Sequence, residues 1–250
     1  MKYEIKYQPA YSLLEVNLEP NESIVAEAGA MVYMSRNIRV ETRKREKKSL
    51  WKSLKTALLG AESFFVNEYF AENEAGKVGF VPAPVGDIKH LEVKPGKGLI
   101  LQKSAYIAST SDVHLDTQWQ GFTKGIFGQS LFMLKVSGQG DLFVNAFGAI
   151  DQHTLGAGEF LIVDNYHLVA FDDTCQYKVR KFGGLKSTIL GGEGLVTEVQ
   201  GPGEVYIQTK NIREFTDWLW ELLHRKVEDT ARRVSEEKGR KGGFRFEKRF

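Results

Sequence analysis

The stretch that decides the fold is Gly201-Pro202-Gly203-Glu204-Val205-Tyr206-Ile207-Gln208-Thr209. Two glycines and a proline mark a turn, and the run that follows is rich in β-branched and aromatic residues, as strands are. Another apolar pair, Leu195-Val196, stands before the turn. The segment 193–208 is therefore expected to form a β-hairpin.

Two other segments carry the same pattern of apolar run, glycine and apolar run. They span 62–80, with the glycine at Gly76, and 129–144, with the glycine at Gly140. The intervals between Gly76, Gly140 and Gly203 are 64 and 63 residues. Self-similarity at a fixed period is typical of repeat architectures, so we expect an all-β fold of three related units.

A second motif, a turn followed by two apolar runs, recurs at a similar interval. Its copies begin near Leu18, Val93 and Leu155, so one of them stands at the other end of the chain from the third hairpin. This predicts a triplicated β body over 1–209 with pseudo-threefold symmetry. Its units are 62–128, 129–192, and 193–209 completed by 1–59. The strand near Tyr3–Tyr7 should then lie beside the one near Val205–Gln208.

Two segments show helical rather than strand periodicity. In 49–60, Leu50, Trp51, Leu54 and Leu58 recur at roughly helical spacing. At the end of the chain, apolar residues recur at three- and four-residue steps after Asn211, which is a suitable helix cap. We expect an amphipathic helix over 210–237, ending near Val234, that docks on the β body or on another subunit, followed by a basic tail over 238–250.

Composition places the 250-residue chain among folded proteins, and its net charge is +2. No apolar run reaches the length of a membrane span, and the N-terminus does not resemble a signal peptide. The single cysteine, Cys175, cannot form an intrachain disulfide, so a cytoplasmic location is expected. Two segments, 36–55 and 238–250, carry local charges of +7 and +5, which leaves −10 for the rest of the chain.

The first basic segment invites three interpretations. It could contact nucleic acid by neutralising phosphates, it could bind an anionic membrane surface, or it could be a solvated loop with a short docked helix. The residues that would make such contacts are Arg43, Lys44, Arg45, Lys47, Lys48, Trp51 and Lys52.

The quoted motifs, together with Ala26–Met34 and Gly60–Phe65, resemble the altered-inheritance-of-mitochondria family of mitochondrial biogenesis proteins and its bacterial and archaeal relatives. The resemblance covers about residues 8–209. The middle copy departs from it, since Gln129-Ser130 stands where a Glu-Gly pattern is expected. The residues that carry the signature are Gly29, Ala30, Met31, Gly60, Glu62, Gly192, Glu193, Gly194, Gly201 and Gly203.

The resemblance implies a fold similar to the tryptophan RNA-binding attenuation protein, in which each repeat is a short double-stranded β-helix. It also implies a homotrimer whose nine units form a ring. It carries over no catalytic residues, and it implies an accessory role in mitochondrial biogenesis or respiration.

The residues themselves indicate no catalytic, cofactor or metal site. The five histidines never form His-x-His, although His90 and His153 fall near equivalent positions of the repeat. Ser63 stands outside a nucleophile elbow, and Cys175 is expected to be a small buried residue. Glu27, Glu62 and Glu193 are candidate carboxylates, but Glu62 and Glu193 occupy matching positions of the repeat and are better explained as a repeated structural contact.

The leading interpretation is a non-enzymatic oligomeric scaffold or interaction protein. An RNA or single-stranded nucleic-acid binding ring is one alternative, because the attenuation protein has a related fold and the chain has a basic segment. A cupin-like metalloenzyme is the other.

Overall fold

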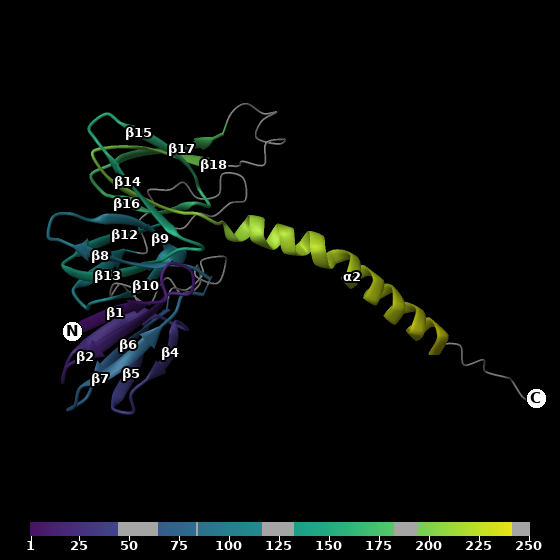
Figure 1. Ribbon diagram of the computed structural model, residues 1–250, viewed down its shortest axis with the longest axis horizontal. Helices are drawn as coiled ribbons and strands as arrows, with labels where there is room; N and C mark the ends of the chain where they lie inside the picture. Colours follow the sequence, from purple (N-terminus) through teal and green to yellow (C-terminus); the bar gives the residue numbers. More distant parts are fainter. Residues whose placement is uncertain (45–64, 84, 117–132, 183–194, 242–250) are drawn as a thin grey trace, which may run out of the picture. The chain divides into compact units, whose positions relative to one another are not determined.

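The computed structural model describes residues 1–44, 65–83, 85–116, 133–182 and 195–241. These residues form two compact units, a β body over Met1–Lys210 and a helical unit that begins at Asn211. The all-β body and the C-terminal helix are thus as predicted (Figure 1). The predicted helix over 49–60 lies outside the described residues.

The strands fall into three consecutive stretches. The first contains β1 (Lys2–Lys6), β2 (Leu13–Leu18), β3 (Ser23–Glu27), β4 (Met31–Met34), β5 (Ile38–Lys44), β6 (Phe65–Ala71) and β7 (Gly76–Phe80). The second contains β8 (Ile88–Val93), β9 (Leu99–Gln102), the 3-10 helix η1 (Lys103–Ala105), β10 (Tyr106–Ser109), β11 (Val113–Asp116), β12 (Met133–Gly138) and β13 (Gly140–Asn145). The third contains β14 (Ile150–Leu155), β15 (Phe160–Asp164), β16 (Leu168–Asp172), β17 (Gln176–Lys181), β18 (Leu195–Gln200) and β19 (Gly203–Gln208), and is followed by helix α2 (Ile212–Lys241).

Strand pairing follows the same antiparallel scheme in each stretch. In this count β1 is left out, so that each stretch has six strands. The sixth strand lies between the first and the third, as in β2–β7–β4, β8–β13–β10 and β14–β19–β16. The fifth strand lies between the second and the fourth, as in β3–β6–β5, β9–β12–β11 and β15–β18–β17. Within the described residues, each stretch thus supplies two sets of three strands, and the first stretch has an additional strand, β1, that pairs with β2.

Two seams join these sets into larger sheets. β3 pairs with β10, which makes the six-stranded sheet β5-β6-β3-β10-β13-β8. β9 pairs with β16, which makes the six-stranded sheet β11-β12-β9-β16-β19-β14. The sets at the two ends of the body form smaller sheets, β1-β2-β7-β4 and β15-β18-β17.

The hairpins predicted at Gly76, Gly140 and Gly203 are wrong, because the strands on either side of each glycine belong to different sheets. At these positions the chain turns a corner between sheets instead of folding back on itself. Gly138 shows why the corner needs glycine: its φ is +106°, and a Cβ there would lie 2.1 Å from the Asp112 carbonyl oxygen. Glycine tolerates both the positive φ and the close backbone approach.

The predicted contact between Tyr3–Tyr7 and Val205–Gln208 is also wrong. β1 pairs with β2, and β19 lies between β14 and β16, so both of its edges are occupied within the third stretch. The strands of 193–209 and those of 1–59 therefore do not complete one another. Pairing between neighbours in the sequence closes shorter loops and costs less chain entropy than pairing the two ends of the chain.

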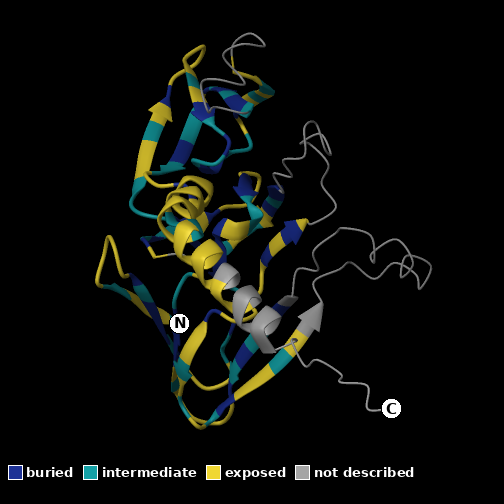
Figure 2. Cartoon of the chain, turned by 90° about the vertical axis from the view of Figure 1, so that its right-hand side faces the viewer, coloured by how far each residue is buried: buried dark blue, intermediate teal, exposed yellow. Residues whose placement is uncertain are grey.

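Buried residues occur in all three stretches of the body (Figure 2). Three buried clusters follow one another, and the seams lie inside them: Ile24 of β3 and Ile107 of β10 share one cluster, and Ile100 of β9 and Phe171 of β16 share another. Several strands supply these clusters with consecutive buried residues and are therefore buried on both faces: all four residues of β10 and the first four of β16 are buried.

Helix α2 begins as predicted but ends later. The backbone N–H of Glu214 donates a hydrogen bond of 2.7 Å to Asn211 Oδ1, so Asn211 caps the helix. The helix continues past Val234 and through Gly239 to Lys241, which corrects the predicted end. A single glycine costs a helix only about 1 kcal/mol, so it need not end one. No helix of the described residues is long and apolar enough to cross a bilayer.

Candidate assembly interface

The two end sheets each expose an apolar edge strand. β4 has the sequence Met-Val-Tyr-Met and lies at the edge of the first sheet, and β15 has the sequence Phe-Leu-Ile-Val-Asp and lies at the edge of the last. Among the described strands, β4 pairs only with β7 and β15 only with β18. Exposed apolar edges are hazards that proteins usually blunt with charges, prolines or covering elements.

Positions can be matched between stretches by their register. Tyr33, Ala108 and Ala170 lie opposite Gly79, Phe143 and Tyr206, the fourth residues of β7, β13 and β19. Each of the three pairings also has a register irregularity one residue before this position. By this matching Val32 corresponds to Ile107 and Val169, and Ile162 corresponds to Val25 and Ile100.

Exposure separates the end strands from their counterparts inside the body. The side chain of Val32 is 53% exposed, whereas Ile107 and Val169 are fully buried. Ile162 is 50% exposed, whereas Ile100 is 3% exposed. The counterparts are buried because a neighbouring set covers them at a seam, and β4 and β15 carry similar apolar residues with no described strand over them.

A polar cluster fixes β4 to its sheet, with one residue from each of the four strands. The Tyr33 hydroxyl donates to Glu15 Oε2 at 2.5 Å, and Lys6 Nζ and Lys77 Nζ lie 3.1 Å and 3.4 Å from Glu15 Oε1. The hydrogen bond from Tyr33, helped by Lys6, lowers the pKa of Glu15 to about 2. Gly79 makes room for the Tyr33 ring, since a Cβ there would lie 2.5 Å from it. The cluster therefore presents β4 as an ordered edge.

A cavity of about 270 Å³ lies at the seam between the second and third stretches, among residues of β8, β9, β16 and β19. Its two aspartates accept backbone hydrogen bonds, Asp172 from the Glu204 N–H and Asp173 from the Gly98 N–H, both at 3.0 Å, and Glu92 Oε2 lies 3.0 Å from Lys94 Nζ. Burial raises the pKa of Asp172 and raises that of Tyr206, which also lines the cavity, to about 12. These contacts hold the turns at the seam, so the carboxylates have structural partners.

Glu27 differs from the other carboxylates singled out in the sequence. It ends β3, where register matches it to Gln102 of β9 and Asp164 of β15. Burial raises its pKa to about 7, opposed by the charge of Lys103. It does not line the cavity at the seam. Glu62 and Glu193 lie outside the described residues.

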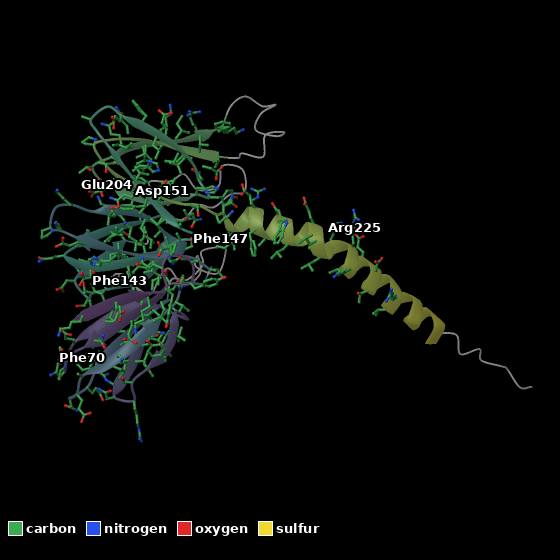
Figure 3. The ribbon with its side chains drawn as sticks, viewed as in Figure 1. Phe70, Phe143, Phe147, Asp151, Glu204 and Arg225 are labelled. Carbon is green, nitrogen blue, oxygen red and sulfur yellow. The ribbon has the colours of Figure 1, made fainter. Side chains whose placement is uncertain are left out.

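The histidines and the cysteine have local partners. His90 Nε2 lies 2.7 Å from Asp141 Oδ1, with its ring against Phe143, a residue labelled in Figure 3. His153 lies 3.1 Å from Asp151. Cys175 is buried as predicted, although it precedes β17 instead of lying within it, and burial raises the pKa of its thiol to about 11. Within the described ranges, no three His, Cys, Asp or Glu residues gather where they could hold a metal ion.

The predicted contact residues of the basic segment fall mostly outside the described residues. Arg43 and Lys44 end β5, where their backbones pair with Val66 and Phe65 of β6. Arg45, Lys47, Lys48, Trp51 and Lys52 lie in the range that is not described. Contact of this segment with nucleic acid or an anionic surface thus stays a prediction.

Some of the signature residues lie in the described part of the chain and others lie outside it. Gly29, with a φ of +97°, and the buried Ala30 form the turn before Met31 of β4. Gly201 lies in the β18–β19 corner, where a Cβ would meet the Gly156 carbonyl oxygen at 2.5 Å, and Gly203 begins β19. Gly60, Glu62, Gly192, Glu193 and Gly194 lie outside the described residues.

The sequence alone did not identify β15 as an edge strand, although the run Phe160–Val163 is visible as an apolar strand.

Comparison with known proteins agrees with the family resemblance. The family model described as Mitochondrial biogenesis AIM24 matches residues 3–210. An uncharacterized protein of Streptococcus pyogenes serotype M6 is 29% identical over 229 residues, which cover 89% of this chain and 91% of the relative. The crystal structure of a Streptococcus pyogenes protein, solved by structural genomics, matches with a TM-score of 0.73 and 28% identity, over 89% of this chain and 99% of that one.

Proposed function

The chain belongs to the family Mitochondrial biogenesis AIM24, and from this premise we propose that it is a non-catalytic scaffold or interaction protein that assembles with copies of itself. The proposal keeps the accessory role that the family description suggests and assigns no reaction. The observation that carries it is the pair of exposed apolar edges, β4 and β15.

The sheet order explains how two copies would join. Inside the chain, each large sheet forms when the second strand of one stretch pairs with the third strand of the next, as in β3–β10 and β9–β16. Counted without β1, β4 is the third strand of the first stretch, and β15 is the second strand of the last stretch. Pairing β15 of one copy with β4 of the next would build a third sheet on the same plan as the two existing ones.

Register within the chain sets the register of this contact. Phe171 lies opposite Ile100, and Ala170 lies opposite Leu101, at the second seam. Transferred to the ends, Met34 of one copy should lie opposite Ile162 of another, and Tyr33 opposite Val163. Apolar cross-strand pairs of this kind stabilise a sheet by roughly 0.2–1 kcal/mol each, and burying both edges removes apolar area from water.

A head-to-tail contact repeats from copy to copy until a ring closes. We infer closure as the homotrimer implied by the resemblance, with the three stretches of each copy as equivalent units of a nine-unit ring. In this interpretation each unit is a short double-stranded β-helix over about 13–80, 88–145 or 150–208. The cytoplasmic location stays a prediction.

Two edge variants test the proposal. Ile162→Lys places a charge on β15 and Met34→Lys places one on β4, and charged edges oppose strand pairing. We expect the unaltered chain to show the mass of a trimer by light scattering at micromolar concentration and each variant to show the mass of a monomer. A monomeric unaltered chain would contradict the proposal.

Mixing the two variants separates head-to-tail pairing from symmetric pairing. Met34→Lys keeps an intact β15, and Ile162→Lys keeps an intact β4, so an equimolar mixture should form a heterodimer and stop there. If like edges paired instead, each variant alone would retain one self-complementary edge and would dimerise without mixing. Thr154→Lys, on the exposed side of β14, is the matched control and should leave the trimer unchanged.

A further inference from the structure

Helix α2 exposes a broad apolar surface. Between Ile212 and Glu228 every side chain is exposed or half-buried, and the large apolar ones include Trp218 at 54%, Trp220 at 62% and Leu222 at 54% exposure. Side chains along the helix, Arg225 among them, are drawn in Figure 3. Such a surface normally marks a binding face.

The two tryptophans border this surface on opposite sides. With 3.6 residues per turn, the arc from Trp218 to Trp220 that contains the apolar residues spans about 200°. Between Ile212 and Glu228, the residues within the arc are Ile212, Phe215, Leu219, Leu222, Leu223 and Val227, together with Thr216 and Lys226. The apolar face of a helix that packs against a single other helix spans a narrower arc than this.

Charged side chains are also arranged relative to the two borders of the arc. Projected at about 100° per residue, Arg213 lies next to Trp220 at one border and Arg225 lies next to Trp218 at the other. Between Ile212 and Glu228 the acidic residues occupy the middle of the polar arc: Glu214, Asp217, Glu221 and Glu228. The pattern ends there, because Asp229 projects onto the apolar arc next to Trp218. Lys226 interrupts the apolar face, but a lysine can extend its ammonium group to the polar border.

We propose that the first half of α2, Ile212–Glu228, lies flat on a phospholipid bilayer, with the apolar arc in the acyl region. Both borders of the arc would then sit at headgroup depth, where tryptophan is enriched, and Arg213 and Arg225 would meet lipid phosphates. The acids would face water, away from the phosphates. This arrangement matches an amphipathic helix in the plane of the interface, and it does not depend on how copies of the β body assemble.

Flotation of the full chain with vesicles tests the proposal. We expect binding to phosphatidylcholine vesicles and tighter binding when phosphatidylglycerol is included. Phe215→Gln with Leu222→Gln should lower the partition coefficient at least about tenfold, because two apolar side chains leave the acyl region. Glu221→Gln with Glu228→Gln, an equal number of glutamines on the polar arc, should bind as well as the unaltered chain. Far-UV circular dichroism establishes that both double variants keep the helix.

Tryptophan fluorescence locates the contact. Vesicles should shift the emission to shorter wavelength, and Trp218→Phe with Trp220→Phe should remove the shift while binding persists, although the chain has two other tryptophans. The proposal fails if vesicles neither bind nor shift the emission, if the shift survives this substitution, or if the Phe215 and Leu222 variant binds like its control. It also fails if that variant only lowers the mass of the lipid-free protein, which would assign the face to another helix.

Discussion

At the scale of the residue, Glu27 carries the clearest electrostatic signal. A half-buried carboxylate at the end of β3 has its pKa raised to about 7 from 4.5 by burial. Between these values the Glu27 carboxyl is protonated in the folded protein and ionised in the unfolded one. The contribution of Glu27 to the free energy of unfolding is therefore greatest below pH 4.5 and is lost as pH rises through 7. The second stretch has glutamine, Gln102, at the matching position.

Glu27→Gln should therefore stabilise the protein above pH 7 by on the order of 2 kcal/mol and leave it unchanged below pH 4.5, since each unit of pKa shift is worth about 1.4 kcal/mol before solvent screening. Denaturant unfolding at fixed protein concentration on both sides of this range measures the difference. Glu19→Gln, at an exposed carboxylate, is the control and should change neither value. Equal stabilisation at both pH values would argue against burial of the charge as the cause.

At the scale of the element, α2 depends on its first turn. Asn211 satisfies one of the N–H groups that a helix leaves without a partner at its start. The side chains from Ile212 to Thr230 are exposed or half-buried. Local capping then contributes a larger share of the stability of this helix than it would in a packed one.

Asn211→Ala should destabilise the start of α2 by about 1 kcal/mol, because the Glu214 N–H loses its acceptor. Faster hydrogen exchange of the first-turn amides measures this. Asn211→Asp keeps an acceptor and adds a charge that favours a helix N-terminus, so it should preserve protection. Equal exchange in both variants would show that the cap does not hold the helix.

At the scale of the whole molecule, the β body and the helix are separate compact units. All three core clusters lie within Met1–Lys210, so the stability of the body should not depend on α2. Its assembly, as proposed, uses strand edges of the body alone. If both proposals hold, the helix adds membrane binding to an oligomer of the body.

A chain that ends at Lys210 should keep the thermal unfolding midpoint and the oligomeric mass of the full chain but lose vesicle binding. Calorimetry, light scattering and flotation measure the three properties. A lower midpoint would show that α2 packs on the body, and a monomeric body would place the assembly contact in the helix. The full chain at the same concentration is the reference, because association shifts apparent stability.

The sequence by itself determined the elements that depend on local chemistry. Runs rich in β-branched and aromatic residues predicted the strands, the glycines marked turns, Asn211 marked the start of α2, and the recurrence of Gly76, Gly140 and Gly203 indicated related stretches. These features depend on near neighbours in the chain, which a sequence displays directly.

Only the tertiary structure decided which strands pair. A glycine between two strands fits a hairpin and a corner between sheets equally well, and the choice depends on partners such as Asp112 that lie far from the glycine in the sequence. Likewise, β1 resembles a strand that could complete β19, but β14 and β16 already occupy both edges of β19. The exposed edges at β4 and β15 follow from that pairing, because an apolar strand becomes an interface only when the fold leaves its edge uncovered.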